Sequence, residues 1–189
     1  MKVTNQKTID ADLVELFYKL YAGAFTPIAS LAAARHVLSF DEFAEEMADE
    51  RIDKHVYWSE FGEPVALATY TRDLSAIPWI SPAFYARRFP EHAARDAIVY
   101  MGYSLVHPDH QGKGMMSVLL EDNIATVRAV DGIGVFDVCA YNDERQIGYL
   151  RKMIATMGTV EPVDTQTYYA CTFNEDASYL NREKSEAAS

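Results

Sequence analysis

Two nearly continuous apolar runs, AIVYMGYSLV at 97–106 and VFDVCAY at 135–141, enclose a segment with helical spacing. The apolar residues of that segment lie on one helical face: Met116, Leu119, Leu120, Ile124 and Val127. Central strands that are covered on both faces have continuous apolar runs, so this order predicts a βαβ unit with two parallel strands. We therefore expect an α/β (α+β) domain with a mixed central sheet flanked by helices.

The N-terminal part of the chain predicts two helices. The first has apolar residues at helical spacing, namely Leu13, Leu16, Phe17, Leu20 and Tyr21. We expect it to begin at a capping pair, Asp12 and Glu15, and to end at Gly23. The second follows Pro27, in SFDEFAEEMADE at 39–50, where Phe40, Phe43 and Met47 form the apolar stripe. We interpret the acidic residues around that stripe as a solvated helix face.

The middle of the chain predicts a hairpin followed by a long connection. HVYWSE at 55–60 and PVALATYT at 64–71 are separated by a turn-like FGE, which is typical of a β-hairpin. The connection at 73–96 is rich in proline and aromatic residues. Connections of this length favour a lid or binding loop, but SPAFYARRF within it equally fits a short packing helix.

Near the C-terminus, a helix is predicted from Asn142 to Met157, with Gly158 as its end, and TYYACTF at 167–173 predicts a last strand. The segment 174–189 is polar and predicts a flexible tail, which leaves 1–173 as a single domain. No apolar stretch in the sequence approaches the roughly 20 residues that span a bilayer.

Composition limits the class of protein. The chain has 189 residues, 49% of them hydrophobic, and can bury one core. A formal net charge of -11 argues against nucleic acid or an anionic membrane as a partner, because both are bound through clustered basic residues. Cys139 and Cys171 lack CxxC spacing, so we expect no disulfide framework and a reducing, cytoplasmic location. His107 and His110 have no evident third ligand, so we expect no metal site.

The most informative segment is SLVHPDHQGKGMMSVLLED at 104–122, in which a strand ends and a glycine-containing turn opens a helix. Gly112 and Gly114 lack the Cβ atoms that would keep an anion from the backbone, and the first helical turn offers unpaired N–H groups. Lys113 adds a positive charge. Neither GxxxxGK[ST] nor GxGxxG fits this turn, but Q/R-x-x-G-x-G/A does.

Three motifs in order give the sequence a resemblance to the GNAT superfamily of acyl-CoA-dependent N-acyltransferases. They are VHPDHQGKG at 106–114 after a strand, DVCAYN at 137–142, and Tyr149 seven residues after Asn142. The resemblance covers roughly 10–173 and implies a GNAT-like mixed sheet with a strand, phosphate loop and helix that bind coenzyme A.

The resemblance also implies how acetyl-CoA, or another acyl-CoA, would be bound. Amides of the turn would hold the pyrophosphate, and the strand edge before the turn would pair with the pantetheine amides. The implied cofactor-binding residues are Ser104, Leu105, Val106, Gln111, Gly112, Lys113, Gly114, Met115, Met116, Ser117 and Asn142. Met116 and Ser104 depart from the family pattern, and Met116 is expected to crowd the turn.

The resemblance implies two catalytic residues. Asp137 aligns with a general-base glutamate of the family, and burial would raise its pKa; the alternative is a structural carboxylate at a strand end. Tyr149 lies off the apolar stripe of its helix and would protonate the leaving thiolate, or else it is a surface tyrosine. Asn142 is expected to cap its helix. An acyl-enzyme on Cys139 lacks a paired histidine, so direct attack in a ternary complex is preferred.

The sequence thus predicts an enzyme that transfers an acyl group, most simply acetyl, to a primary amine of a small molecule or peptide, as a monomer or homodimer. Two other classes stay open: a non-catalytic acyl-CoA-binding regulatory module, and a partner-binding protein that uses the aromatic segment 79–89. The sequence does not identify the acceptor.

Overall fold

The computed structural model describes residues 1–33, 37–144, 148–155 and 157–171. The chain divides into two compact units, Met1–Ile147 and Gly148–Ser189, which we describe separately. Among the described residues we find no helix with the length and hydrophobicity of a membrane span.

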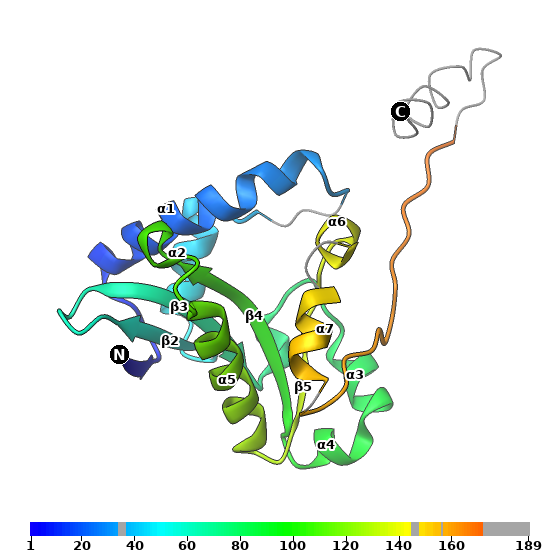
Figure 1. The fold of residues 1–189 in the computed structure, drawn as a ribbon. Helices are drawn as coiled ribbons and strands as arrows, with labels where there is room; N and C mark the ends of the chain where they lie inside the picture. Colours follow the sequence, from blue (N-terminus) through cyan, green and yellow to red (C-terminus); the bar gives the residue numbers. More distant parts are fainter. Residues whose placement is uncertain (34–36, 145–147, 156, 172–189) are drawn as a thin grey trace. The chain divides into compact units, whose positions relative to one another are not determined.

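The first unit is built on a five-stranded mixed sheet in the order β1-β2-β3-β4-β5 (Figure 1). The strands are β1 Lys2–Gln6, β2 Asp53–Trp58, β3 Pro64–Thr71, β4 Ile98–Val106 and β5 Ile133–Val135. Neighbouring strands are antiparallel except β4 and β5, which are parallel. The predicted hairpin and the predicted parallel pair are confirmed, whereas β1 was not predicted.

The second strand of the parallel pair is shorter than the sequence predicts. β5 ends at Val135, and residues 136–139 have no regular structure. In the described part of the chain β5 has one neighbouring strand and three paired residues, so the expectation of a central strand over 135–141 is wrong. The apolar run of the sequence continues beyond Val135, but no residue after Val135 pairs with β4.

Helices and short 3-10 turns join the strands. They are α1 Ala11–Phe25, η1 Thr26–Ser30, α2 Phe40–Ala48, η2 Leu74–Ala76, α3 Pro82–Arg88, α4 Pro90–Ala94, η3 Pro108–His110, α5 Met115–Arg128 and α6 Ala140–Asn142. α1 has its N-cap at Asp10 and continues past Gly23, so both predicted ends are wrong by a few residues. The connection at 73–96 contains α3, whose Tyr85 is buried, which confirms the packing helix.

The sheet has a core on each face because successive side chains of a strand point to opposite sides. On one face α1 and α2 pack on the strands, and the buried residues there include Phe17, Phe43, Val56, Leu67 and Leu105. On the other face α5 packs on the strands, with Tyr57, Ala68, Val99, Met115 and Leu119 among the buried residues (Figure 1). The strands in the middle of the sheet are therefore covered on both sides.

β4 carries a bulge beside the place where it separates from β5. Tyr70 of β3 pairs with Met101, but Ala68 pairs with Ser104, so β4 has one extra residue. Gly102 lies in this bulge, and a Cβ atom there would clash with Thr69 Oγ1. The register with β5 ends at Tyr100, so the remainder of β4 has no β5 residue opposite it.

The second unit contains α7, Gly148–Ile154. Of the predicted helix 142–157, the described residues 142–144 and 148–154 are helical, residues 145–147 and 156 lie outside the described residues, and the helix ends at Ile154, before the predicted end at Met157. The predicted strand 167–173 is also wrong over its described part. Residues 167–171 are irregular and exposed, with the Tyr169 side chain 87% exposed; Thr172, Phe173 and the predicted tail lie outside the described residues.

Candidate functional site

The glycine turn between β4 and α5 has the backbone that its sequence predicts. Gly112 and Gly114 have φ values of 71° and 81°, a left-handed conformation that glycine adopts without strain. Gly114 is the N-cap residue of α5. The Gln111 side chain donates from Nε2 to the Val106 carbonyl at 3.3 Å, which ties the turn to the end of β4.

The turn presents backbone donors at the positive end of a helix. Among the described residues, the N–H groups from Gly112 to Met116 donate to no backbone carbonyl, whereas Ser117 N–H donates to the Gly114 carbonyl at 3.0 Å. Cβ atoms at Gly112 and Gly114 would meet nothing within 4 Å, so the space beside them is open. These donors, the exposed Lys113 and the dipole of α5 suit an anion. The Ser117 amide is already used within α5, so it is not among these free donors.

The two methionines of the turn differ in environment. Met115 is buried in the core under α5, whereas Met116 is 55% exposed. Met115 therefore anchors the first turn of the helix, and its predicted contribution to an anion site is limited to its amide. Met116, the second residue of α5, is a bulky and exposed side chain directly after the turn.

The edge of β4 leads from the bulge to this turn. Ser104 is exposed, Leu105 is buried and Val106 is partly buried. These three residues lie beyond Tyr100, the last β4 residue with a partner in β5, so the edge of the strand that faces β5 is open here. An extended chain with amide groups can pair with such an edge. The geometry thus fits a ligand that joins a pyrophosphate to an amide-containing chain.

Asp137 lies just beyond the end of β5. Its side chain is exposed, so the expected burial is wrong, because the strand that was predicted to bury it ends at Val135. Asp137 Oδ1 accepts hydrogen bonds from Trp79 Nε1 at 3.2 Å and from the Tyr100 hydroxyl. Tyr100 is the last residue of β4 paired with β5. This cluster of carboxylate, phenol and indole therefore marks the point where the two strands separate.

The two remaining predicted site residues, Asn142 and Tyr149, belong to different units of the chain. Asn142 is the last residue of α6, and Cys139 occupies the N-cap position, so Asn142 does not cap a helix as predicted. Tyr149 lies in α7 of the second unit, and its side chain lies outside the described residues.

A carboxylate that the sequence analysis assigned to solvent lies instead against β4. Glu46 of α2 is partly buried, and burial raises its pKa from 4.5 to about 7, although the Tyr103 hydroxyl and Lys54 oppose this shift. The Tyr103 hydroxyl is itself buried and has no well-formed hydrogen bond within the described residues. Helical spacing could have located Glu46, because it lies 60° from Phe43 on the helix, at the border of the apolar stripe.

Lys54 of β2 carries the positive charge that favours the ionised form of this carboxylate, and it is fully buried. Its Nζ donates to the carbonyls of Lys7 at 2.8 Å and Asp49 at 2.6 Å. Burial lowers the pKa of Lys54 to about 8, although the neighbouring carboxylates favour its charged form. Lys54 thus joins the end of α2 to the sheet beneath it.

A second unpredicted cluster lies on the opposite face of the sheet. Asp122 Oδ2 of α5 accepts hydrogen bonds from the hydroxyls of Tyr57 and Tyr70 and lies 2.7 Å from His55 Nδ1. Burial alone would raise the pKa of Asp122, but the hydrogen bonds from His55 and Tyr57 outweigh it and lower the pKa. Asp122 is seven residues after Met115, on the buried face of the helix, and this spacing is the signal that would have found it.

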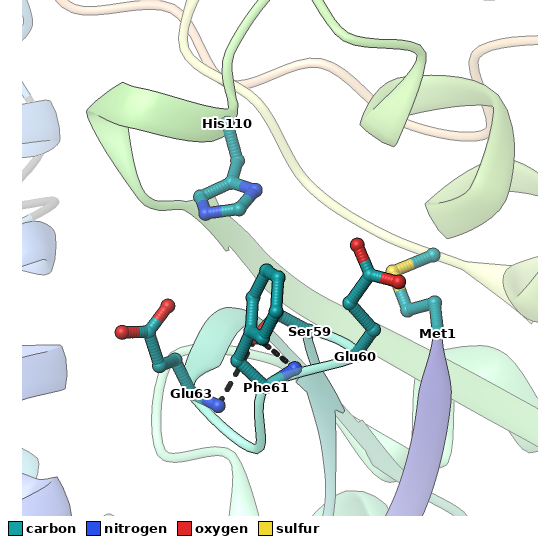
Figure 2. A pocket seen from close by; sticks show the side chains of 6 residues that line it. All are labelled: Met1, Ser59, Glu60, Phe61, Glu63 and His110. Carbon is teal, nitrogen blue, oxygen red and sulfur yellow. Dashed lines mark hydrogen bonds between the residues drawn. The ribbon is translucent and has the colours of Figure 1, made fainter.

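A hollow of about 460 Å³ lies beside η3 and the β2–β3 turn. Figure 2 shows its lining, in which His110 lies opposite Phe61 and the two acidic side chains Glu60 and Glu63. Ser59 Oγ holds the turn by accepting hydrogen bonds from the N–H groups of Phe61 and Glu63. The acidic lining does not suit a phosphate, so the glycine turn is the better anion site. Within the described residues no three metal-ligating side chains gather.

Comparisons with known proteins support the fold. Neither a family model nor a curated protein matches the sequence. A tetramutant of a Bacillus halodurans protein is similar in structure, with a TM-score of 0.57 and 14% identity over 90% of this chain and 100% of that one. A possible acetyltransferase from Clostridium difficile has a TM-score of 0.55 and 15% identity over 91% and 100%.

A third similar structure is an aminoglycoside acetyltransferase from an uncultured soil metagenomic sample, in complex with sisomicin. Its TM-score is 0.51, with 12% identity over 90% of this chain and 96% of that one. The mixed sheet, the glycine turn after β4 and these likenesses agree with one another. The chain has the fold of the GNAT acyltransferases.

Proposed function

We propose that this protein transfers an acyl group, most simply acetyl, from acyl-CoA to a primary amine of a small molecule or peptide. The observation that carries the proposal is the glycine turn after β4, whose unpaired amides adjoin an open strand edge. The acetyltransferase structures that share the fold support acyl transfer as the general class.

The proposal assigns binding to the residues of the turn and the strand edge. The amides from Gly112 to Met116 and the charge of Lys113 would hold the pyrophosphate, and Ser104, Leu105 and Val106 would pair with the pantetheine amides. The bound coenzyme supplies an acyl group activated as a thioester. With a net charge of -11, the chain as a whole repels this polyanion, so the local donors must supply its affinity.

The acceptor amine must be bound and must lose protons, and the proposal places the groups for both tasks where β4 and β5 separate. An alkyl ammonium has a pKa of about 10 and must lose a proton before it attacks. Asp137, beside the 52% exposed Trp79, presents a carboxylate and an aromatic ring, which both attract ammonium groups. The proposal keeps Asp137 as a candidate base and Tyr149 as the candidate acid for the leaving thiolate.

A coupled thiol-release assay with acetyl-CoA and a panel of primary amines tests the function. We expect turnover with at least one amine, and a Gly112→Ala variant that binds acetyl-CoA at least 10-fold more weakly, because its Cβ occupies the anion's approach. Gly62→Ala is the matched control, since Gly62 also has a positive φ, 79°, and open surroundings but lies in the β2–β3 turn. Equal affinities in the two variants would contradict the assignment of the turn.

A second candidate function is a non-catalytic acyl-CoA-binding module. The exposed Met116 favours it, because this bulky residue follows the turn directly as the second residue of α5 and would crowd a bound coenzyme. This alternative predicts saturable binding of acetyl-CoA with no thiol release from any amine in the panel. A Met116→Ala variant that gains turnover would show that Met116 is what limits the reaction.

A further inference from the structure

We propose that the Tyr100 hydroxyl positions the Asp137 carboxylate to bind the ammonium group of the acceptor, and that the Trp79 ring selects a cationic alkyl amine there. The inference rests on the proposed function and deepens it, because it names the side chains that choose the acceptor. Trp79 and Tyr100 lie outside the three motifs at 106–114, 137–142 and 149. Tyr100 acts here as a positioning residue and Trp79 as a specificity residue.

Three hydrogen bonds join segments that are far apart in the sequence. Tyr100 is in β4, Asp137 follows β5, and Trp79 lies between η2 and α3. The Tyr100 hydroxyl donates to Asp137 Oδ1. Trp79 Nε1 donates to the Tyr100 hydroxyl oxygen at 3.1 Å and to Asp137 Oδ1 at 3.2 Å. These bonds fix the Asp137 side chain at a place where the strand before it has already ended.

The cluster extends from the core of the first unit to its surface. Tyr100 is 4% exposed, whereas Trp79 is 52% exposed and the Asp137 side chain is exposed. An indole that served packing alone would gain more from burial, since aromatic rings stabilise proteins mainly through the apolar area that they bury. The open end of the cluster, formed by Trp79 and Asp137, is therefore the part that a ligand can reach.

The hydrogen bonds leave one oxygen of the Asp137 carboxylate available. Both bonds that the carboxylate accepts go to Oδ1, and within the described part of the chain Oδ2 accepts none. Burial and the charge of Asp137 raise the pKa of Tyr100 well above its usual range, so the phenol stays protonated and acts as the donor. Tyr100 thus holds Oδ1, and Oδ2 is left for an N–H group of the acceptor.

The Trp79 ring determines which acceptors fit. The hydrogen bond from Nε1 holds the ring beside the carboxylate, so that one ammonium group can contact both. An indole face and a carboxylate each attract a cation, whereas a neutral hydroxyl group gains little from either. The alkyl chain next to the nitrogen would lie against the apolar ring. This combination favours a cationic alkyl amine over a neutral acceptor.

This subsite adjoins the strand edge that we assign to the coenzyme. Tyr100 is the last β4 residue with a partner in β5, and beyond it the edge of β4 that faces β5 is open. The proposed pantetheine positions, 104–106, lie on the same edge, nearer to the glycine turn. The acyl end of the coenzyme would therefore extend along β4 toward Tyr100, where Asp137 would hold the amine.

The first test measures the fluorescence of Trp79 alone. The chain has two tryptophans, and Trp58→Phe removes the other one, which lies in β2. In this protein we expect butylammonium to change the Trp79 emission saturably, and butanol, a neutral molecule of similar size, to leave it unchanged. Asp137→Asn should weaken butylammonium binding by about 5-fold. An equal response to butanol, or an unchanged affinity in Asp137→Asn, would overturn the inference.

A double-mutant cycle separates positioning from a merely structural effect. Tyr100→Phe should weaken butylammonium binding by about 3-fold, because the carboxylate loses a donor. The same change should have no further effect in the Asp137→Asn protein, where the charge that Tyr100 positions is absent. A loss of equal size in both proteins, or no loss in either, would reject Tyr100 as the positioning residue.

Steady-state kinetics connects the subsite to the reaction. In the thiol-release assay, Trp79→Leu should raise KM for the amine by about 3-fold, and Trp79→Phe, which keeps an aromatic face, should stay closer to the wild type. The KM for acetyl-CoA should not change in either variant. An unchanged KM for the amine in Trp79→Leu would reject Trp79. If the wild-type protein releases no thiol with any amine, the proposed function fails and the acceptor subsite with it, whereas an active wild type whose Trp79 emission ignores butylammonium rejects the subsite alone.

Discussion

Two carboxylates face tyrosines on opposite faces of the same sheet, and they differ in how many hydrogen bonds they accept. Asp122, on the α5 face, is bonded by Tyr57, Tyr70 and His55, and its pKa is lowered. Glu46, on the α1/α2 face, faces Tyr103 without a well-formed hydrogen bond, and its pKa is raised to about 7. A carboxylate with enough donors stabilises the fold, and one that lacks them stays available for chemistry.

The hydrogen bonds of Asp122 also support the glycine turn, although Asp122 lies further along α5. Asp122 joins α5 to β2 and β3 through Tyr57 and Tyr70. The N-terminus of α5 carries the glycine turn. The hydrogen bonds of Asp122 thus hold in place the helix whose amides we propose to bind pyrophosphate.

The largest effect is expected for Asp122→Ala. This change leaves the buried Tyr57 hydroxyl without its acceptor and removes the partner of His55, whereas Tyr70 keeps Asn123 Oδ1 as an acceptor; we expect the free energy of unfolding to fall by about 3 kcal/mol. Urea denaturation measures it, with Glu121→Ala, an exposed neighbour, as the control. Equal stability of the two variants would show that the cluster does not support the fold.

A smaller loss of stability is expected for Gly102→Ala, a change next to Tyr103 in β4. The added Cβ would clash with Thr69 Oγ1, so the bulge must shift, at a cost of about 2 kcal/mol. The double variant Gly102→Ala/Thr69→Ala should recover part of this loss in the same denaturation experiment. The shift should also displace Tyr103 and change the titration of Glu46. A Gly102→Ala variant with wild-type stability would mean that the bulge does not depend on glycine.

The two carboxylates should give the stability opposite pH dependences. Asp122, with a lowered pKa, stabilises the folded state above about pH 4, and this contribution is lost as the pH falls further. Glu46, with its pKa raised from 4.5 to about 7, stabilises the fold below pH 4.5 and loses that contribution as the pH rises to about 7.

Replacing Glu46 by Gln should therefore remove a decline in stability between pH 4.5 and pH 7. Partial exposure reduces the effect to on the order of 1 to 2 kcal/mol. Lys54 has a pKa of about 8 and titrates above this pH range, so it does not contribute to the difference in stability between the wild type and Glu46→Gln. Parallel stability curves for the wild type and Glu46→Gln would contradict the raised pKa of Glu46.

The smallest expected change in stability distinguishes Tyr57 from Tyr103. Tyr57→Phe should cost about 1.5 kcal/mol, because it removes a hydrogen bond to an ionised carboxylate. Tyr103→Phe should change stability by less than about 0.5 kcal/mol, because its hydroxyl forms no well-formed hydrogen bond. Thermal unfolding of both variants tests the contrast, and a larger loss for Tyr103→Phe than for Tyr57→Phe would reverse it.

Local patterns predicted the elements that carry the glycine turn. The apolar run of β4, the helical spacing of α5 and the glycines at 112 and 114 each have a local physical cause, and all three are confirmed. The end of β5 was not predictable from its apolar run, because its length depends on how far β4 accompanies it. β1 was missed because its residues, KVTNQ, are mostly exposed and lack an apolar alternation.

The candidate site was predicted where the backbone forms it and missed where side chains meet across elements. Gly112 and Gly114 have the predicted conformations. Glu46 and Tyr103 are 57 residues apart in sequence, and no motif relates them. The exposed position of Asp137 follows from the early end of β5, which no local pattern contained.

Calorimetric titration of acetyl-CoA into the wild-type protein at low and moderate salt tests the central claim most directly. The account predicts saturable binding at one site per chain, with an affinity that moderate salt leaves nearly unchanged or improves. The reason is that local amides, and not the net charge of -11, attract the anion. Absence of binding, or a steep loss of affinity with salt, would contradict it.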